Sequence, residues 1–199
     1  MQPMHRLEIR RQLAHLLYGP LLITLFHYGW INLSVLFGLI VGGSLMSYFI
    51  KKERMHGMRR LLGFFERDHH MKHFPGRGIL FFTIGAYLNL IIFPTHFAYA
   101  GILILSVGDA ISNVVGRHFG RIKTRLNPDK FVEGSLVGIL ASAPIAYYFL
   151  PNWWAALATA TIAMVFEMPH LRIGRFEIDD NLLIPLSASF SLTLFDKWM

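Results

Sequence analysis

One carboxylate stands inside a long apolar stretch of the sequence. Asp109 lies in the run Leu105-Ser106-Val107-Gly108-Asp109-Ala110, about seven residues, or 10 Å along a helix, from the end of that stretch. An ionisable group in an apolar span is costly and usually functional. On a helix, Ser112, Asn113 and Arg117 would share its face. This polar stripe favours a functional Asp109 over an aspartate that only satisfies neighbouring helices.

A basic loop follows this stripe and leads into the next apolar stretch. It carries Arg117, Arg121, Lys123 and Lys130, and the stretch then opens with Glu133-Gly134-Ser135. Cationic side chains and the free N–H groups of a helix N-terminus both bind phosphate. The loop therefore predicts a phosphate-binding segment, with a loop that only orients the chain in a membrane as the alternative.

Further carboxylates stand at the ends of two later apolar stretches. Glu167 closes one stretch, and Asp180-Asn181 opens the last one, where capping of a helix is an alternative role. We expect Asp109, Glu133, Glu167 and Asp180 to gather at one surface among basic residues. Hard carboxylate oxygens suit Mg²⁺, and basic residues suit a polyphosphate.

The composition indicates what kind of scaffold must position these groups. Hydrophobic residues make up 54% of the 199 residues and charged residues only 16%, with a net charge of +7. Soluble domains usually carry about 25% charged residues, so an ordinary soluble domain and a disordered chain are both disfavoured. The chain has no cysteine, which excludes disulfides, thiolate catalysis and cysteine-ligated metals.

Seven uncharged or nearly uncharged stretches approach the length needed to cross a hydrocarbon layer of about 30 Å. They cover residues 13–30, 31–50, 78–93, 97–116, 132–150, 153–166 and 182–198. The third and sixth are short, and the sixth also suits a re-entrant or interfacial segment. The first lacks a clear signal-peptide cleavage site, so we expect it to be retained. The sequence predicts one all-α domain over residues 1–199, a polytopic membrane bundle of about seven transmembrane helices.

The positions of the basic residues predict the orientation of the bundle. Eighteen of the 19 Lys and Arg residues fall in the N-terminal segment and in segments 51–77, 117–130 and 167–181, on one side of seven spans. A nucleic-acid binder has no reason to segregate charge in this way. By the positive-inside rule the N-terminus and the site face the cytoplasm, in a prokaryotic cytoplasmic membrane or an ER-type membrane.

Segment 51–77 is predicted to be a cytoplasmic juxtamembrane segment, and 117–131 a cytoplasmic basic loop. Within residues 51–67, apolar side chains recur at helical spacing between Lys and Arg, which is typical of an interfacial helix on anionic lipid. A gate for lipid access is the sharper alternative. The histidines at 69, 70 and 73 invite a transition-metal site, but a solvated stretch is the simpler interpretation.

Together these motifs resemble the CTP-dependent lipid-alcohol kinases, a family that includes dolichol, phytol and farnesol kinases and a CTP-dependent diacylglycerol kinase. The residues that carry the resemblance are Gly108-Asp109-Ala110, Gly116-Arg117-His118-Phe119-Gly120, Lys130-Phe131-Val132-Glu133-Gly134-Ser135, Asp180-Asn181 with Pro185-Leu186, Arg10-Arg11 with His15 and Gly19, and Pro75-Gly76-Arg77-Gly78. Relatives often have two adjacent lysines before Glu-Gly-Ser and a small hydroxyl residue after them. This chain has Asp129-Lys130 and Phe131 instead.

The resemblance implies transfer of the γ-phosphate of CTP to a membrane-lipid hydroxyl with a divalent cation, most simply Mg²⁺. It implies that Asp109, Arg117, Lys130, Glu133, Gly134, Ser135, Asp180 and Asn181 form the site. With the residue patterns above, we expect catalytic roles for Asp109, Glu133 and Asp180. Metal contacts are expected from Asp109, Asp180 and Glu167. Nucleotide contacts are expected from Ser112, Asn113, Arg117, Arg121, Lys123, Lys130, Gly134, Ser135 and Asn181.

Other readings stay open at this point. Asp109 is either a metal ligand or the base toward the lipid hydroxyl. A cytidylyltransferase that makes a CDP-lipid would usually carry a Lys-Arg pair and a Gly-rich Asp-Arg ending, which the sequence lacks. A transporter would use the buried aspartate as an ion site. The acceptor lipid stays undetermined, because hydrophobic grooves discriminate poorly between apolar chains. The oligomeric state is equally open.

Overall fold

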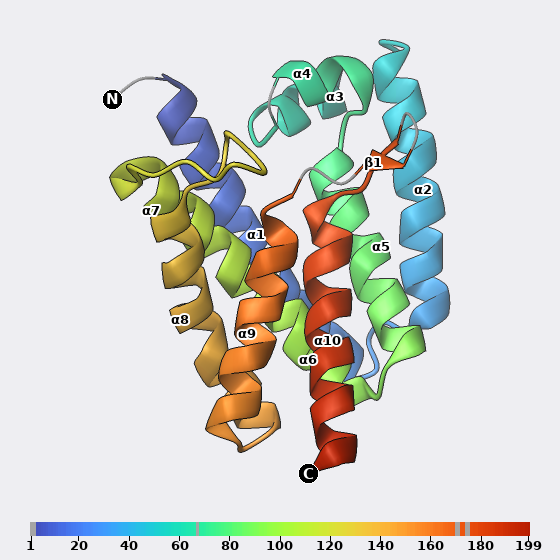
Figure 1. Ribbon diagram of the computed structural model, residues 1–199. Coiled ribbons are helices and arrows are strands. Elements are labelled where there is room, and N and C mark those ends of the chain that lie inside the picture. The colour runs from blue at the N-terminus through green and yellow to red at the C-terminus, as the bar shows by residue number, and fades with distance from the viewer. Residues whose placement is uncertain (1–2, 67, 170–171, 174–175) are drawn as a thin grey trace.

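Every apolar stretch of the sequence forms a helix in the computed structural model, which describes residues 3–66, 68–169, 172–173 and 176–199 (Figure 1). The prediction of an all-α fold is confirmed, with one pair of two-residue strands beside the helices. The long helices are α1 (Pro3–His27), α2 (Leu33–Lys51), α5 (Arg77–Ile92), α6 (Thr95–Ile104), α7 (Ala110–Phe119), α8 (Val132–Phe149), α9 (Trp153–Glu167) and α10 (Asp180–Trp198). A π-helical turn, η1 (Leu105–Asp109), joins α6 to α7.

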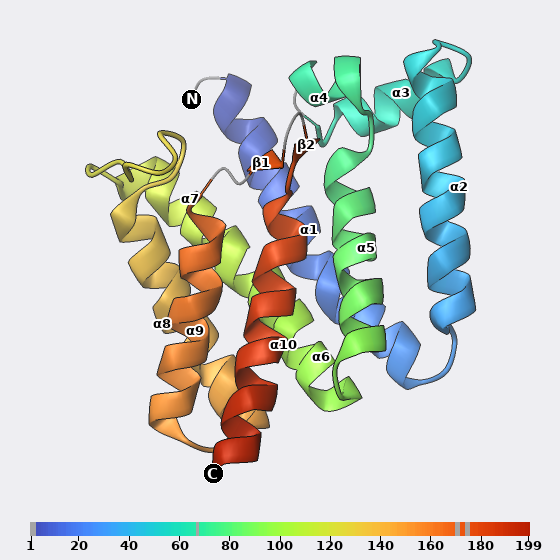
Figure 2. The same cartoon turned by 45° about the vertical axis from the view of Figure 1, so that its right-hand side comes forward.

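The loops that carry the predicted site lie together at one end of the bundle. The start of α1, the short helices α3 (His56–Gly63) and α4 (Asp68–His73), and loop 120–131 lie there (Figures 1 and 2). The antiparallel strands β1 (Arg172–Ile173) and β2 (Phe176–Glu177) lie at the same end. The opposite end holds the C-terminus and the turns that join α1 to α2, α5 to α6 and α8 to α9. The described parts of the four basic segments therefore share one end of the molecule.

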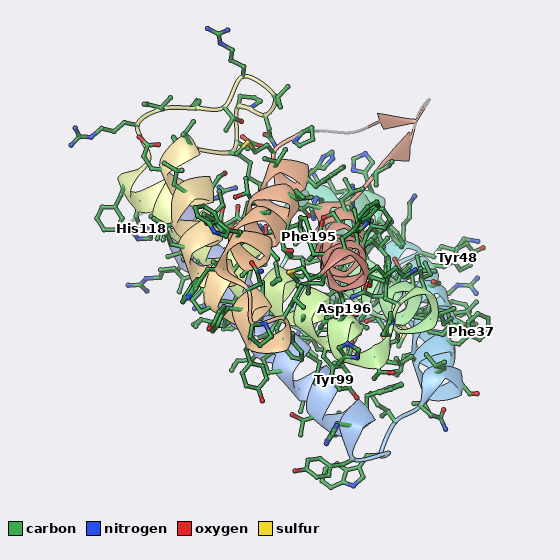
Figure 3. All side chains as sticks on the ribbon, turned by 60° about the horizontal axis from the view of Figure 1, so that its bottom comes forward. Phe37, Tyr48, Tyr99, His118, Phe195 and Asp196 are labelled. Carbon is green, nitrogen blue, oxygen red and sulfur yellow. The ribbon has the colours of Figure 1, made fainter. Side chains whose placement is uncertain are left out.

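Within the described residues, three helices are long and apolar enough to cross a membrane. They are α2, α8 and the continuous α6–η1–α7 rod from Thr95 to Phe119, while α5 and α9 are shorter apolar helices. The outer surface is also apolar, as expected where lipid replaces water. Phe37 and Tyr48 on α2 are about half exposed and lie at the edge of the bundle in Figure 3. These features support a membrane protein.

The core forms where α6 and η1 pack against α10. Ile102, Ile104 and Leu105 are fully buried there, as are Ile184 and Leu192 of α10. The α6–η1–α7 rod also contacts α1 and α8, so it is the element around which the other helices pack. Because Asp109 ends η1, the most central helix carries the carboxylate that the sequence singled out.

Glycines allow two helix pairs to approach closely at the level of the predicted site. A Cβ added at Gly134 of α8 would lie 2.4 Å from the carbonyl oxygen of Ser112 on α7. A Cβ at Gly85 of α5 would lie 2.2 Å from the carbonyl oxygen of Asn181 on α10. Pro185 has no N–H to bond that carbonyl. Small residues therefore set how near α7, α8 and α10 stand to their partners.

An acidic side chain in segment 51–77, Glu66, bonds this segment to the start of α5. No residue of α3 is buried, and the helix ends at Gly63, short of the predicted range 51–67. Glu66 is buried and accepts hydrogen bonds from the backbone N–H groups of Gly76 (2.7 Å) and Gly78 (3.3 Å) at the start of α5. Gly76 adopts a left-handed φ of 81° in that turn. Burial raises the pKa of Glu66, against the opposing effect of these N–H groups.

The contact between Gly85 and Asn181 is testable by adding one methyl group. Gly85→Ala should force α5 and α10 apart and destabilise the protein by about 1–3 kcal/mol. The measurement is the thermal unfolding midpoint in detergent. Gly38→Ala on α2 is the matched control, because a Cβ there meets no atom within 4 Å. Equal midpoints for the two variants would contradict the packing described here.

The buried Glu66 should make stability depend on pH. Because its pKa is raised in the folded state, the folded protein holds this proton more tightly than the unfolded chain does. The stability that the proton contributes is complete below the unfolded pKa and is lost as the pH rises through the folded pKa. Unfolding midpoints of the wild type and Glu66→Gln, measured across this range, should therefore diverge, with the wild type losing more. Parallel curves would refute this assignment.

Candidate active site

Lys130 lies at the centre of the predicted site, surrounded by three carboxylates. Its Nζ is 3.1 Å from Asp109 Oδ1, 2.5 Å from Glu167 Oε1 and 3.4 Å from Asp180 Oδ2. Burial alone would lower the pKa of Lys130, but the three carboxylates outweigh it and raise the pKa above its ordinary value. The carboxylates come from η1, α9 and α10, so the tertiary fold assembles the site. We call these four residues the Lys130 cluster.

The π-helical turn and the residues after it orient Asp109. Such turns occur mostly as single-turn insertions within α-helices, and frequently at functional sites. One helical turn later, Asn113 Nδ2 donates to Asp109 Oδ1 (2.7 Å) and to the Asp109 carbonyl oxygen (2.9 Å). Ser112 Oγ donates to Glu167 Oε1 (2.9 Å). The polar stripe predicted on this helix therefore holds two of the carboxylates in place.

Glu133 lies in the first turn of α8 and makes its contacts with the basic loop. Its carboxylate accepts hydrogen bonds from the backbone N–H groups of Arg121 (2.9 Å) and Ile122 (3.1 Å). The loop is closed further by the Thr124 N–H, which donates to the carbonyl oxygen of Lys130 (3.0 Å). These bonds fix the return of the chain to the start of α8. Glu133 thus shapes the loop that presents Lys130 to the carboxylates.

The other residues predicted to bind phosphate divide into a buried and an exposed set. Gly134 and Ser135 are buried at the start of α8, where Ser135 Oγ donates to the Phe131 carbonyl oxygen (3.4 Å). Arg121 and Lys123 are exposed. Arg117 lies beside α1, with its Nε 3.8 Å from Glu8 Oε1. A small crevice on this side is lined by Ser112, Asn113, Gly116, Arg117, Asp129, Lys130 and Phe131.

At the start of α10, Asp179 caps the helix and Asp180 belongs to the site. Asp179 is the N-cap, accepting from the Asn181 N–H (3.2 Å) and side-chain amide (2.7 Å). Its other oxygen accepts from Arg77 Nε (2.9 Å), which ties α10 to α5. Burial and the neighbouring Asp180 raise the pKa of Asp179 to about 7, although Arg77 opposes this. Since Asp179 caps the helix, Asp180 is available to Lys130.

A cavity of about 300 Å³ opens beside Asp109, between α1, α5, α10 and the segment that carries Glu66. Its wall is largely apolar, and its polar end holds Asp109, Asp180 and three buried atoms that lack a hydrogen-bond partner. These atoms are Gln12 Oε1, His15 Nε2 and Asn181 Oδ1. The apolar wall consists of Ala14, Tyr18, Leu62, Phe65, Ile79 and Phe82.

Gln12 and His15 are site residues that the sequence prediction did not include. His15 Nε2 lies 3.6 Å from Asp109 Oδ2, within ion-pair range but beyond a hydrogen bond. The signal was present in α1, where Glu8, Gln12 and His15 recur at helical spacing and so share one face. Among the described residues, no group of three or more His, Asp or Glu side chains is arranged as a ready metal site.

Comparison with known proteins gives related lipid kinases. The chain is 26% identical to the CTP-dependent diacylglycerol kinase 1 of Schizosaccharomyces pombe over 133 residues, which is 59% of each chain. It is 31% identical to the probable chloroplastic phytol kinase 2 of Oryza sativa over 101 residues, which is 46% of this chain and 33% of that protein. It is 27% identical to the dolichol kinase EVAN of Arabidopsis thaliana over 99 residues, which is 44% of this chain and 16% of that protein.

The matched stretches thus cover less than two thirds of each of these three relatives. No family model and no solved structure matches the chain. The relatives nevertheless agree in kind, since all three are named as kinases of lipid alcohols. The chain is therefore related to the family of CTP-dependent lipid kinases, as its motifs indicated.

Proposed function

We propose that this protein is an integral-membrane kinase that transfers the γ-phosphate of CTP to the hydroxyl of a membrane lipid. The acceptor would be a polyprenol or dolichol, a phytol-like isoprenoid alcohol, or diacylglycerol. One observation carries the proposal: the Lys130 cluster lies between an apolar-walled cavity and a basic loop. Such a site gives an apolar alcohol and a polyphosphate separate approaches to the same carboxylates. The names of the relatives support the same activity.

The cavity supports an alcohol as the lipid end group. Its apolar wall, including Ile79 and Phe82, suits a hydrocarbon chain. Its polar end offers unpartnered acceptors on Gln12 and Asn181, and a hydroxyl is a donor that such atoms lack. Asp109 lines the same end, where its carboxylate would take the hydroxyl proton as the oxygen attacks phosphorus. The apolar wall would also keep water from competing with the alcohol as a nucleophile.

The nucleotide would approach from the loop side. Arg117 lines the crevice, Arg121 and Lys123 are exposed on the loop, and the three cations would attract the triphosphate. Lys130 would meet the phosphates closest to the carboxylates and spread the charge that develops during transfer. Glu133 would act by holding the loop, through its bonds to the N–H groups of Arg121 and Ile122.

The carboxylates also fit a divalent cation in their chemistry. Asp109, Glu167 and Asp180 offer hard oxygen atoms, which Mg²⁺ prefers. Glu167 Oε2 is buried without a hydrogen-bond partner, so one such oxygen is already unsatisfied. These three residues would hold the metal, which when bound would neutralise charge on the phosphates.

The membrane arrangement is part of the proposal. All seven apolar helical segments would cross the bilayer, with the N-terminus and the site on the cytoplasmic side of a prokaryotic or ER-type membrane. The gathering of the basic segments at one end supports this, because Lys and Arg accumulate on cytoplasmic loops. The helices α5 and α9 have 16 and 15 residues, so local thinning of the bilayer would be needed around them.

Replacing Asp109 tests the proposed chemistry. Asp109→Asn should lower CTP-dependent lipid phosphorylation by about 10²- to 10⁴-fold, because an amide neither accepts the proton nor holds a cation well. The assay follows labelled CTP with polyprenol, phytol and diacylglycerol in detergent micelles. Asp196→Asn is the control, since Asp196 is exposed near the other end of α10 (Figure 3). Near-full activity in Asp109→Asn would remove it from the chemistry.

The products of the same assay separate the competing functions. A kinase releases CDP and a phosphorylated lipid, whereas a cytidylyltransferase releases pyrophosphate and makes a CDP-lipid. A transporter would turn over no nucleotide with any of these lipids. Release of pyrophosphate, or no turnover by the wild type across the three lipids, would overturn the proposed function.

A bulky residue at the cavity wall tests where the lipid binds. Ile79→Trp should raise the KM for the lipid several-fold and leave the KM for CTP nearly unchanged, because Ile79 lines the cavity away from the loop. Ile91→Trp is the matched control, since Ile91 is on the same helix and similarly exposed but outside the cavity. Equal lipid KM values for the two variants would place the lipid elsewhere.

A further inference from the structure

We propose that Lys130 is a tethered cation that holds the place of the divalent cation in the resting protein and leaves it when the metal binds. The inference rests on the proposed function for its purpose, namely the delivery of a metal to a phosphoryl-transfer site. The exchange itself is a property of the resting protein and can be measured without substrate. Lys130 would thus have two positions: one among the carboxylates before the metal binds, and a later one at the nucleotide.

The geometry fixes the resting position. An ammonium has three N–H donors, and each of the three carboxylates lies within ion-pair distance of Nζ. Glu167 is almost completely buried, and the Asp109 and Lys130 side chains are nearly so. No other cation is recorded within salt-bridge distance of Glu167 or Asp180 among the described residues. Among the described residues, Lys130 is therefore the only lysine or arginine within salt-bridge distance of these three carboxylates.

Charge balance makes departure of Lys130 an exchange. Asp109 and Glu167 are buried and Asp180 is partly exposed, and three carboxylates around one ammonium would repel one another if no cation remained. The ammonium can therefore leave only as another positive charge arrives. The site already offers that charge an unused ligand, because Glu167 Oε2 is buried and accepts no hydrogen bond. Asn181 Oδ1, also unpartnered, lines the adjoining cavity beside Asp109 and Asp180.

The loop provides the second position of Lys130. Lys130 lines the crevice on the loop side and also contacts the carboxylates. The flexible four-carbon stem of Lys130 would let Nζ swing from the carboxylates toward the crevice, while Glu133 and Thr124 hold the loop backbone. In the crevice, the ammonium would face phosphate oxygens near Arg117 and Ser112. Lys130 would thus leave the carboxylates when the metal binds and would then bind the nucleotide.

The test is Mn²⁺ binding to the resting protein. Free Mn²⁺ is measured by electron paramagnetic resonance, with no nucleotide, for the wild type, Lys130→Met and Lys123→Met. Lys130→Met should bind one Mn²⁺ at least about tenfold more tightly than the wild type, because the competing charge is gone. Lys123→Met removes an exposed cation from the same loop and should match the wild type. Equal affinity in Lys130→Met and the wild type would overturn the proposal, as would an equal gain in both variants.

A second measurement uses the unaltered side chain, in case Lys130→Met fails to fold. Labelling of wild-type lysines by an amine-reactive ester is followed by mass spectrometry with and without saturating Mn²⁺. Labelling of Lys130 should rise several-fold with Mn²⁺, while exposed Lys123 serves as the internal reference. Unchanged labelling of Lys130 at saturating Mn²⁺ would refute the exchange. Wild-type kinase activity with that result would leave the proposed function standing, whereas exchange without CTP turnover would leave only the inference standing.

Discussion

A buried ammonium among three carboxylates is the interaction on which the site depends. The carboxylates of Asp109, Glu167 and Asp180 come from three helices, and the two that are buried, Asp109 and Glu167, would be unstable as anions without a cation. Lys130 reaches them from a loop, so the loop and the three helices constrain one another. The glycines at 85 and 134 serve this arrangement, because they let α10 and α8 come close enough for the groups to meet. The close packing of the helices and the neutralisation of the carboxylates by Lys130 therefore depend on each other.

This arrangement divides the molecule into two sides. On one side of Asp109 lies a cavity walled by Tyr18, Ile79 and Phe82, and on the other lies a polar crevice beside Lys130. Separate approaches suit two substrates of opposite character, an apolar alcohol and a charged nucleotide. Glu66 bonds the segment beside the cavity to the start of α5, so the carboxylate of Glu66 links that segment to the lipid side.

Local periodicity predicted much of this arrangement. The i+3 and i+4 spacing of Ser112 and Asn113 from Asp109 correctly placed all three on one helical face, because only local geometry was involved. The contact of Glu133 with loop N–H groups could not be predicted, since it depends on how the loop folds back. The approach of His15 to Asp109 joins helices far apart in the sequence. The seven apolar stretches were found from composition, but their packing order was not.

The π-helical turn has a consequence for how the rod packs. An extra residue in one turn rotates the helix beyond it, so the faces of α6 and α7 are offset from those of one uninterrupted α-helix. With this offset, α6 packs on α10 and α5 while α7 packs on α8 and α1. One rod thus serves two surroundings, an apolar one and the one that holds Asp109 against Lys130.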